Sequence, residues 1–331
     1  MTRWHRPLLL MSAIMAVLSV ISLFGVLLDH RTLDGLPIWL KPLKFTLSFV
    51  AYGLTWAWLL SLRRTAQRAS RLLGNVMAIA CVVEITVIIS QVIRGRRSHF
   101  NFSTALDSSL YALMGTTVML LMLVNLAAAF LVLRERHATP ADTWAIRVGL
   151  VVSAAGLGVA VLMLPPTSAQ LAEVTTTVLG AHGVGVPDGG PGLSLLGWST
   201  TGGDLRVPHF FGMHALQVLP LVALLTRGIR DQAVRLRLVL TAGASYTGLV
   251  ALVTWQALRG QPLVRPDALT LGVAGLLLAG TAIAVPLCLL PLRGGRVGPA
   301  EATPTPAHGP AEPAEPAEPT DDAREAAAVE A

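Results

Sequence analysis

Long apolar runs recur along the chain and are separated by shorter polar connections. Eight runs are each about twenty residues long, which is the length that a helix needs to cross the ~30 Å hydrocarbon core of a bilayer. They cover residues 8–28, 42–61, 72–93, 108–133, 146–164, 209–226, 238–258 and 268–291. The pattern predicts an all-α fold, a polytopic integral membrane helical bundle of about eight transmembrane helices within a domain over residues 1–296. The fifth and sixth runs are the shortest, and an arrangement of seven spans is the main structural alternative.

The composition agrees with a membrane domain and sets the C-terminal segment apart from it. Hydrophobic residues make up 53% of the chain and charged residues only 13%, about half the charged share of a soluble protein. Residues 297–331 differ, because they hold eight acidic side chains and one basic one and repeat Ala-Glu-Pro three times. A segment of this composition has too few apolar residues to form a core, so we expect a disordered acidic Pro/Ala/Glu-rich cytoplasmic tail.

The placement of Lys and Arg among the connections predicts the orientation. With the N-terminus in the cytoplasm, 15 of these residues outside the tail fall on the cytoplasmic side and nine on the outer side, as the positive-inside rule requires. The first run is too long for the apolar part of a signal peptide, so we expect it to remain as the first helix. We therefore expect a multi-pass plasma membrane protein with cytoplasmic N- and C-termini. Since the basic residues are accounted for by these connections, no nucleic acid partner is expected.

Arginine outnumbers lysine 23 to 2 in this chain. This bias is typical of GC-rich bacterial genomes, so the expected location is a bacterial inner membrane.

The longest connection, residues 165–208, carries nine glycines between Gly180 and Gly203. Its second half, 180–203, is expected to be an irregular, Gly-rich outer loop, while residues 168–179 favour a short interfacial helix. Long connections of this kind are often functional lids, although a tolerated insertion explains the same pattern.

Ionisable residues inside transmembrane helices are costly unless they are paired or hydrated, so they are natural candidates for a functional site. Glu84 lies near the centre of the third run, and Gln91 follows seven residues later, on the same helical face. Both are expected to face the bundle interior. Glu84 is then either a proton or ligand site or a protonated, hydrogen-bonded structural residue.

A larger set of polar residues falls in the predicted outer half of the membrane or just above it. The ligand-binding candidates are Lys44, Glu84, Gln91, Arg94, Arg96, Arg97, Asp107, Tyr111, Arg206 and Gln217. The positive-inside rule gives no reason for the three basic residues at 94–97 to lie outside. We expect them to face an anionic group, which is a lipid head group, a carboxylate substrate, or Asp107 and Asp204, with interfacial anchoring as the alternative. The inner half has almost no such residues. The sequence therefore predicts one polar site in the outer half of the bilayer.

Three histidines at the same level, His99, His209 and His214, are candidate metal ligands, because imidazole nitrogens together with a carboxylate suit catalytic zinc. His209 and His214 are five residues apart, ~140° around a helix, so they cannot chelate one metal ion as an i, i+4 pair would. Both cysteines lie inside apolar runs, and we expect neither to form a disulfide or a metal site.

These residues leave several functions open. The preferred interpretation is a transporter or small-ligand-binding membrane protein whose polar site takes a small anionic or polar ligand. The alternatives are a metal-dependent intramembrane enzyme, with zinc as the candidate metal, a haem-binding redox protein, and a structural or assembly protein whose polar residues bond helices together. The sequence contains no P-loop, dinucleotide-binding fingerprint or nucleophile elbow, so it decides neither whether the protein is an enzyme nor which cofactor it uses.

Overall fold

The computed structural model describes residues 4–290, and the expected tail over 297–331 lies outside these residues. Eight helices in the described chain are long and apolar enough to cross a membrane. They are α1 (Arg6–Leu28), α2 (Leu40–Ser61), α3 (Gln67–Ile93), α4 (Ala105–Leu133), α5 (Pro140–Val161), α7 (Arg206–Leu225), α8 (Gln232–Leu258) and α9 (Ala268–Leu289). The predicted all-α bundle is confirmed, and the chain is a multi-pass membrane protein.

Several helices begin earlier than the apolar runs indicate, because polar capping residues extend them. Helix α5 begins at Pro140 rather than at 146, and the Thr139 side chain caps it by accepting a hydrogen bond from the backbone N–H of Asp142. Helix α8 begins at Gln232 rather than at 238, behind an Asp231 cap. A capping side chain satisfies free backbone N–H groups in the first turn, so a helix can begin with polar residues that do not belong to the apolar run.

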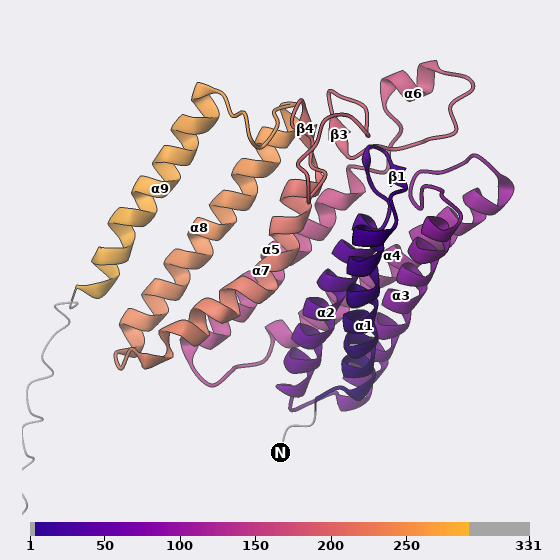
Figure 1. The fold of residues 1–331 in the computed structure, drawn as a ribbon. Coiled ribbons are helices and arrows are strands. Elements are labelled where there is room, and N and C mark those ends of the chain that lie inside the picture. Colours follow the sequence, from indigo (N-terminus) through magenta and orange to yellow (C-terminus); the bar gives the residue numbers. More distant parts are fainter. Residues whose placement is uncertain (1–3, 291–331) are drawn as a thin grey trace, which may run out of the picture. The chain divides into compact units, whose positions relative to one another are not determined.

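The helices of the described chain form two groups (Figure 1). In the first group α1 packs against α2, and α3 packs against α4. In the second group α5 and α7 form the most extensive helix pair, α8 packs against both, and α9 packs mainly against α8. Contacts between α4 and α5 and between α2 and α7 join the two groups.

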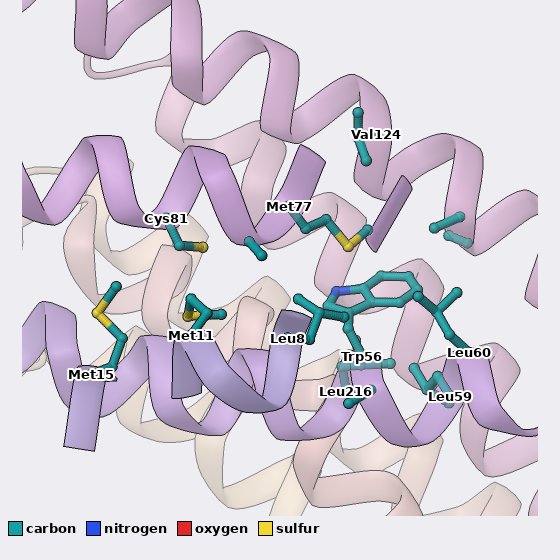
Figure 2. Packing of buried hydrophobic residues seen from close by; sticks show 14 of the residues in the cluster. Leu8, Met11, Met15, Trp56, Leu59, Leu60, Met77, Cys81, Val124 and Leu216 are labelled. Atoms are coloured by element: carbon teal, nitrogen blue, oxygen red, sulfur yellow. The ribbon is translucent and has the colours of Figure 1, made fainter. Parts of the chain in front are cut away.

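A dense apolar core holds the first group together (Figure 2). The Trp56 side chain of α2 is 1% exposed and packs among Leu8 of α1 and Met77 of α3, while Leu216 reaches the same core from α7. Large, closely packed side chains of this kind fix the relative positions of the helices that carry them.

Small residues bring the backbones of α5 and α7 together. A Cβ atom on Gly156 would lie 2.6 Å from the backbone of Gly212, and one on Gly212 would lie 2.5 Å from the Cα atom of Gly156. Glycine at both positions therefore permits a close helix crossing that a larger residue at either position would prevent.

Four connections lie at one end of the bundle, at the top in Figure 1. We call this the covered end, and it comprises residues 29–39, 94–104, 162–205 and 259–267. It contains two short antiparallel pairs, β1 (Thr32–Leu33) with β2 (Leu36–Pro37) and β3 (Gly183–Val184) with β4 (Gly203–Asp204), and the short helix α6 (Ser168–Ala172). The opposite end carries the 3-10 turn Thr226–Gly228.

The Gly-rich loop over 180–203 is more regular than expected from its composition. Strands β3 and β4 pair across its base, and a bridge between Gly192 and Ser199 closes its tip. The loop reaches across to the β1–β2 turn, where Gly189 lies against Asp34 and Gly197 packs on Leu36. Gly197 has φ +67°, a conformation that favours glycine. The loop is thus folded back over the start of α2.

Candidate functional site

The chain contains only two lysines, Lys41 and Lys44, and both lie in the first turns of α2 at the covered end. Helix α2 starts at Leu40 behind Trp39, which makes no side-chain cap, and its first turn has no acidic residue. Cations at the N-terminus of a helix are repelled by the helix dipole, so this position favours anions over lysines. Two lysines in the first turns of α2 therefore destabilise the helix electrostatically, which suggests that they are present for function rather than for stability.

The Lys41 ammonium contacts a histidine rather than a carboxylate. Its Nζ lies 3.1 Å from Nδ1 of His99, which the Ser98 hydroxyl also approaches at 3.0 Å. The His99 ring lies between Phe45 and Phe100, with ring centroids 5.9 and 6.2 Å away. Burial holds the pKa of His99 well below its usual value, and repulsion from Lys41 and His182 lowers it further. A neutral His99 can therefore accept a hydrogen bond from the Lys41 ammonium through Nδ1.

Lys44 and Arg206 anchor the Gly-rich loop through backbone carbonyls. Lys44 Nζ donates to the carbonyl of Leu196 at 2.8 Å, and Arg206 Nη2 donates to that of Gly197 at 2.6 Å. Arg206 also forms a two-point ion pair with Asp204, whose nearer contact is 2.6 Å. Among residues 4–290, neither lysine forms an ion pair with a carboxylate.

Four of the predicted ligand residues form paired, structural contacts instead. Asp107 is fully buried, accepts hydrogen bonds from Gln91 at 2.9 Å and Arg94 at 2.6 Å, and also accepts from the Thr104 hydroxyl at 2.8 Å. This network joins the end of α3 to the start of α4. Arg97 forms an ion pair with Asp34 and so ties the α3–α4 connection to the β1–β2 turn. The anionic groups that face Arg94 and Arg97 are therefore carboxylates of the chain itself, Asp107 and Asp34.

Other candidates lie apart from the two lysines. Arg96 is exposed, and Tyr111 packs against Phe100 and Phe102. Gln217 Nε2 donates to the Thr55 hydroxyl at 3.1 Å, which links α7 to α2, and its Oε1 lies 3.2 Å from Nδ1 of His214.

Two of the candidate residues each have a buried polar atom without a hydrogen-bond partner in the described structure. Nε2 of His214 and Oε1 of Glu84 have no hydrogen-bond partner, and the Glu84 residue is only 2% exposed. Glu84 lies within electrostatic range of Lys41 when it is ionised.

The three histidines that are candidate metal ligands each contact a different group. His99 contacts Lys41, Nδ1 of His209 lies 2.8 Å from the Gly156 carbonyl, and His214 contacts Gln217. No three His, Cys, Asp or Glu side chains among the described residues come together as a group that could hold a metal ion. Metal binding by these histidines stays a prediction that the geometry of residues 4–290 does not favour.

The structure adds a pair that sequence reasoning missed. His182 Nδ1 lies 2.6 Å from Oδ2 of Asp188, and the Asp188 carboxylate also accepts the backbone N–H groups of His182 and Gly183. Burial holds the pKa of His182 below its usual value, while Asp188 offsets part of this effect. Burial alone would raise the pKa of Asp188, but the hydrogen bonds from His182 and Gly183 hold it below its usual range. The sequence did hold a hint of this pair, because His182 and Asp188 are the only two titratable residues between 180 and 203.

Comparison of the chain with known protein families, with curated proteins and with solved structures finds no match. The class of the protein, a multi-pass membrane protein, therefore rests on its own eight apolar helices.

Proposed function

We propose that the protein is a transporter that binds a small anionic solute at the covered end, between its two helix groups. The observation that carries the proposal is that both lysines of the chain meet at the start of α2 without a carboxylate partner among residues 4–290. Arg206 lies within electrostatic range of both lysines, and its charge is offset by its ion pair with Asp204.

Electrostatics supports an anion at this position. Partly buried cations that contact only neutral acceptors lose hydration without gaining an opposite charge, which costs several kcal/mol per ion in a low-dielectric setting. An anion with two or more acceptor oxygens would accept hydrogen bonds from Lys41 and Lys44 and benefit from the positive end of the α2 dipole. The arginines at this end are less available, because Arg94, Arg97 and Arg206 already have carboxylate partners.

The placement of the site supports transport rather than static binding. Lys41 and Lys44 belong to α2 in the first helix group, while Arg206 belongs to α7 in the second. Sites between two helix groups are common in transporters, because relative movement of the groups can expose the ligand to either side. The Gly-rich loop contacts both groups through Leu196 and Gly197, so ligand oxygens would compete with these carbonyls for Lys44 and Arg206.

The covered end corresponds to the predicted outer side of the membrane. The positive-inside count and the apolar pattern support cytoplasmic termini in a plasma membrane, with a bacterial inner membrane as the expected location. The proposed solute then meets the site from outside.

Binding to the protein in lipid nanodiscs tests the proposal directly. Sulfate, phosphate, succinate and acetate are titrated and the thermal stability of the protein is followed, since a ligand that binds the folded state raises the apparent melting temperature. We expect at least one anion to stabilise the protein, and Lys41→Gln and Lys44→Gln each to weaken its affinity about tenfold, the equivalent of ~1.4 kcal/mol.

Arg265→Gln is the matched control, because Arg265 is an exposed cation at the same end of the bundle. It should change the affinity less than about twofold, as expected for an exposed, screened charge. The stabilising anion is then used in uptake assays with proteoliposomes. Absence of any stabilising anion, or equal affinities for the wild type and both lysine variants, would refute the proposed function.

A further inference from the structure

His182 lies within electrostatic range of charged groups contributed by three parts of the chain. Its electrostatic neighbours are Asp188 on its own loop, Lys41 of α2 and Arg206 of α7. His99, on the α3–α4 connection, and His209, on α7, are also within range of His182. The imidazole ring is packed edge-on against Phe100, with 5.0 Å between ring centroids.

The hydrogen bonds assign the tautomer of His182. An ionised Asp188 carboxylate can only accept a hydrogen bond, so Nδ1 of His182, 2.6 Å away, carries a hydrogen. The Nε2 lone pair is then available for a second proton. The resulting imidazolium would be stabilised by direct contact with Asp188, as in other histidine–carboxylate pairs.

The other histidines of the cluster are less suited to gain a proton. The Nδ1 lone pair of His99 already faces the Lys41 ammonium at 3.1 Å, so protonation there would place two cations in contact. His209 Nδ1 faces only the neutral carbonyl of Gly156. Of the three, His182 alone has a carboxylate partner among the described residues.

Counting the charges of the site indicates what it can bind. The cations are Lys41, Lys44, Arg97 and Arg206, and the carboxylates are Asp34, Asp188 and Asp204. Arg97 and Arg206 are offset by their ion pairs with Asp34 and Asp204. One added proton on His182 raises the positive charge beside Lys41 and Lys44 by one, and so favours an anion of higher charge.

We propose that this site binds a divalent anion together with one proton, and that His182 takes up the proton at Nε2. The inference rests on the proposed function, because it assumes an anion beside Lys41 and Lys44. On binding, a proton moves from water to Nε2, the Nδ1–H bond to Asp188 is retained, and no covalent bond to the ligand forms. The substrate class is thus a dianion, such as a dicarboxylate, sulfate or a phosphate monoester, rather than a monocarboxylate.

The pH dependence follows from the direction of this coupling. An anion near the imidazole favours its protonated form, so His182 has a higher pKa in the bound state than in the free state. Affinity for the dianion should therefore rise as the pH falls from 8 through the interval between the two pKa values. One coupled proton gives a slope of up to about tenfold per pH unit, and the affinity levels off below the free-state pKa, which burial places under the usual value of about 6.5.

Sulfate is a suitable probe, because its charge is constant between pH 5 and 8, and nitrate serves as the monovalent comparison. Titration calorimetry of the full chain in nanodiscs, in buffers of different ionisation enthalpy, measures both the affinity and the protons taken up. We expect proton uptake with sulfate within the interval, less with nitrate, and about one proton per sulfate less for His182→Gln than for wild type. Above the bound-state pKa, where His182 is neutral in both the free and the bound wild-type site, the variant should bind sulfate within about twofold of wild type, which shows that it is folded.

His30→Gln is the matched control, since His30 is an exposed histidine at the same end, and it should retain the pH slope. Glu84→Gln tests the other buried acid near Lys41. Loss of the slope in Glu84→Gln with its retention in His182→Gln would assign the proton to Glu84 and overturn the inference. Sulfate binding that depends on Lys44 but not on pH would also overturn it while leaving the proposed function intact. Absence of sulfate and nitrate binding at every pH would contradict the proposed function itself.

Discussion

Charged side chains at the covered end are stabilised in two different ways. Asp107 has no exposed surface, and its oxygens accept hydrogen bonds from Gln91, Arg94 and Thr104. Lys41 contacts a nitrogen of His99 and lies 6.0 Å from the centre of the Phe45 ring, and Lys44 donates to a backbone carbonyl. The first arrangement pairs the charges and contributes to folding, whereas the second leaves both lysines without a carboxylate partner among the described residues.

The Asp107 network makes a prediction about stability. Asp107→Asn removes the charge that faces Arg94 inside the protein, and we expect it to lower the free energy of unfolding by about 2 kcal/mol. Asp34→Asn is the control, because Asp34 pairs with Arg97 at 34% side-chain exposure on both sides, and such pairs contribute less than about 1 kcal/mol. Asn also tolerates the φ of 53° at position 34. Unfolding of both variants in mixed micelles measures the difference, and equal losses would contradict the structural role given to Asp107.

At the scale of the elements, the helices are held by two kinds of packing. Large apolar side chains around Trp56 join α1 to α3 in the first group. In the second group, Gly156 and Gly212 allow α5 and α7 to approach at backbone distance. Since lipid is as apolar as the helices, close van der Waals contact rather than hydrophobic burial holds such a crossing together.

The crossing can be tested with one added methyl group. In Gly156→Ala the new Cβ would lie 2.6 Å from the backbone of Gly212, which cannot move aside as a side chain would, so we expect a loss of about 1–3 kcal/mol in stability. Gly158→Ala, two residues along α5, places its Cβ with no atom within 4 Å and should be neutral or slightly stabilising. Thermal unfolding of the detergent-solubilised proteins compares the two. Similar melting temperatures would show that α5 and α7 do not cross as closely as described.

In the whole molecule, the connections between the membrane helices lie at the two ends of the bundle. Residues 29–39, 94–104, 162–205 and 259–267 meet at the covered end, and the Arg-rich connections after α2, α4 and α7 lie at the other. An even number of spans places the start of α1 and the end of α9 on the same side. The candidate site at the covered end therefore lies on the side of the membrane opposite to the start of α1 and the end of α9.

The predicted orientation is tested by labelling single cysteines in intact cells. The native Cys81 and Cys288 are buried, so they should give little background. We expect Gly189→Cys to react with a membrane-impermeant maleimide and Arg230→Cys, exposed at the opposite end, to react only after the cells are opened. Labelling of Arg230→Cys alone in intact cells would invert the orientation and place the lysine site on the cytoplasmic side.

The sequence by itself determined the class of the fold. A chain in lipid must satisfy its backbone hydrogen bonds internally, so each apolar run of about twenty residues becomes a helix whatever its neighbours are. The same argument missed the starts of α5 and α8, where the Thr139 and Asp231 caps add a polar first turn. The clustering of Gln91, Arg94 and Asp107 was foreseeable too, because a short connection joins their helices.

Only the tertiary structure decided which charges remain without a carboxylate partner. Sequence position could not show that Lys41 would contact His99, because this contact depends on how α2 packs against the α3–α4 connection. Nor could it show that the Gly-rich loop would fold back over α2 and bring Leu196 to Lys44, 152 residues away along the chain. Glycines leave the path of such a loop open, and its position, with that of His182 and Asp188, follows from contacts with the β1–β2 turn and α7.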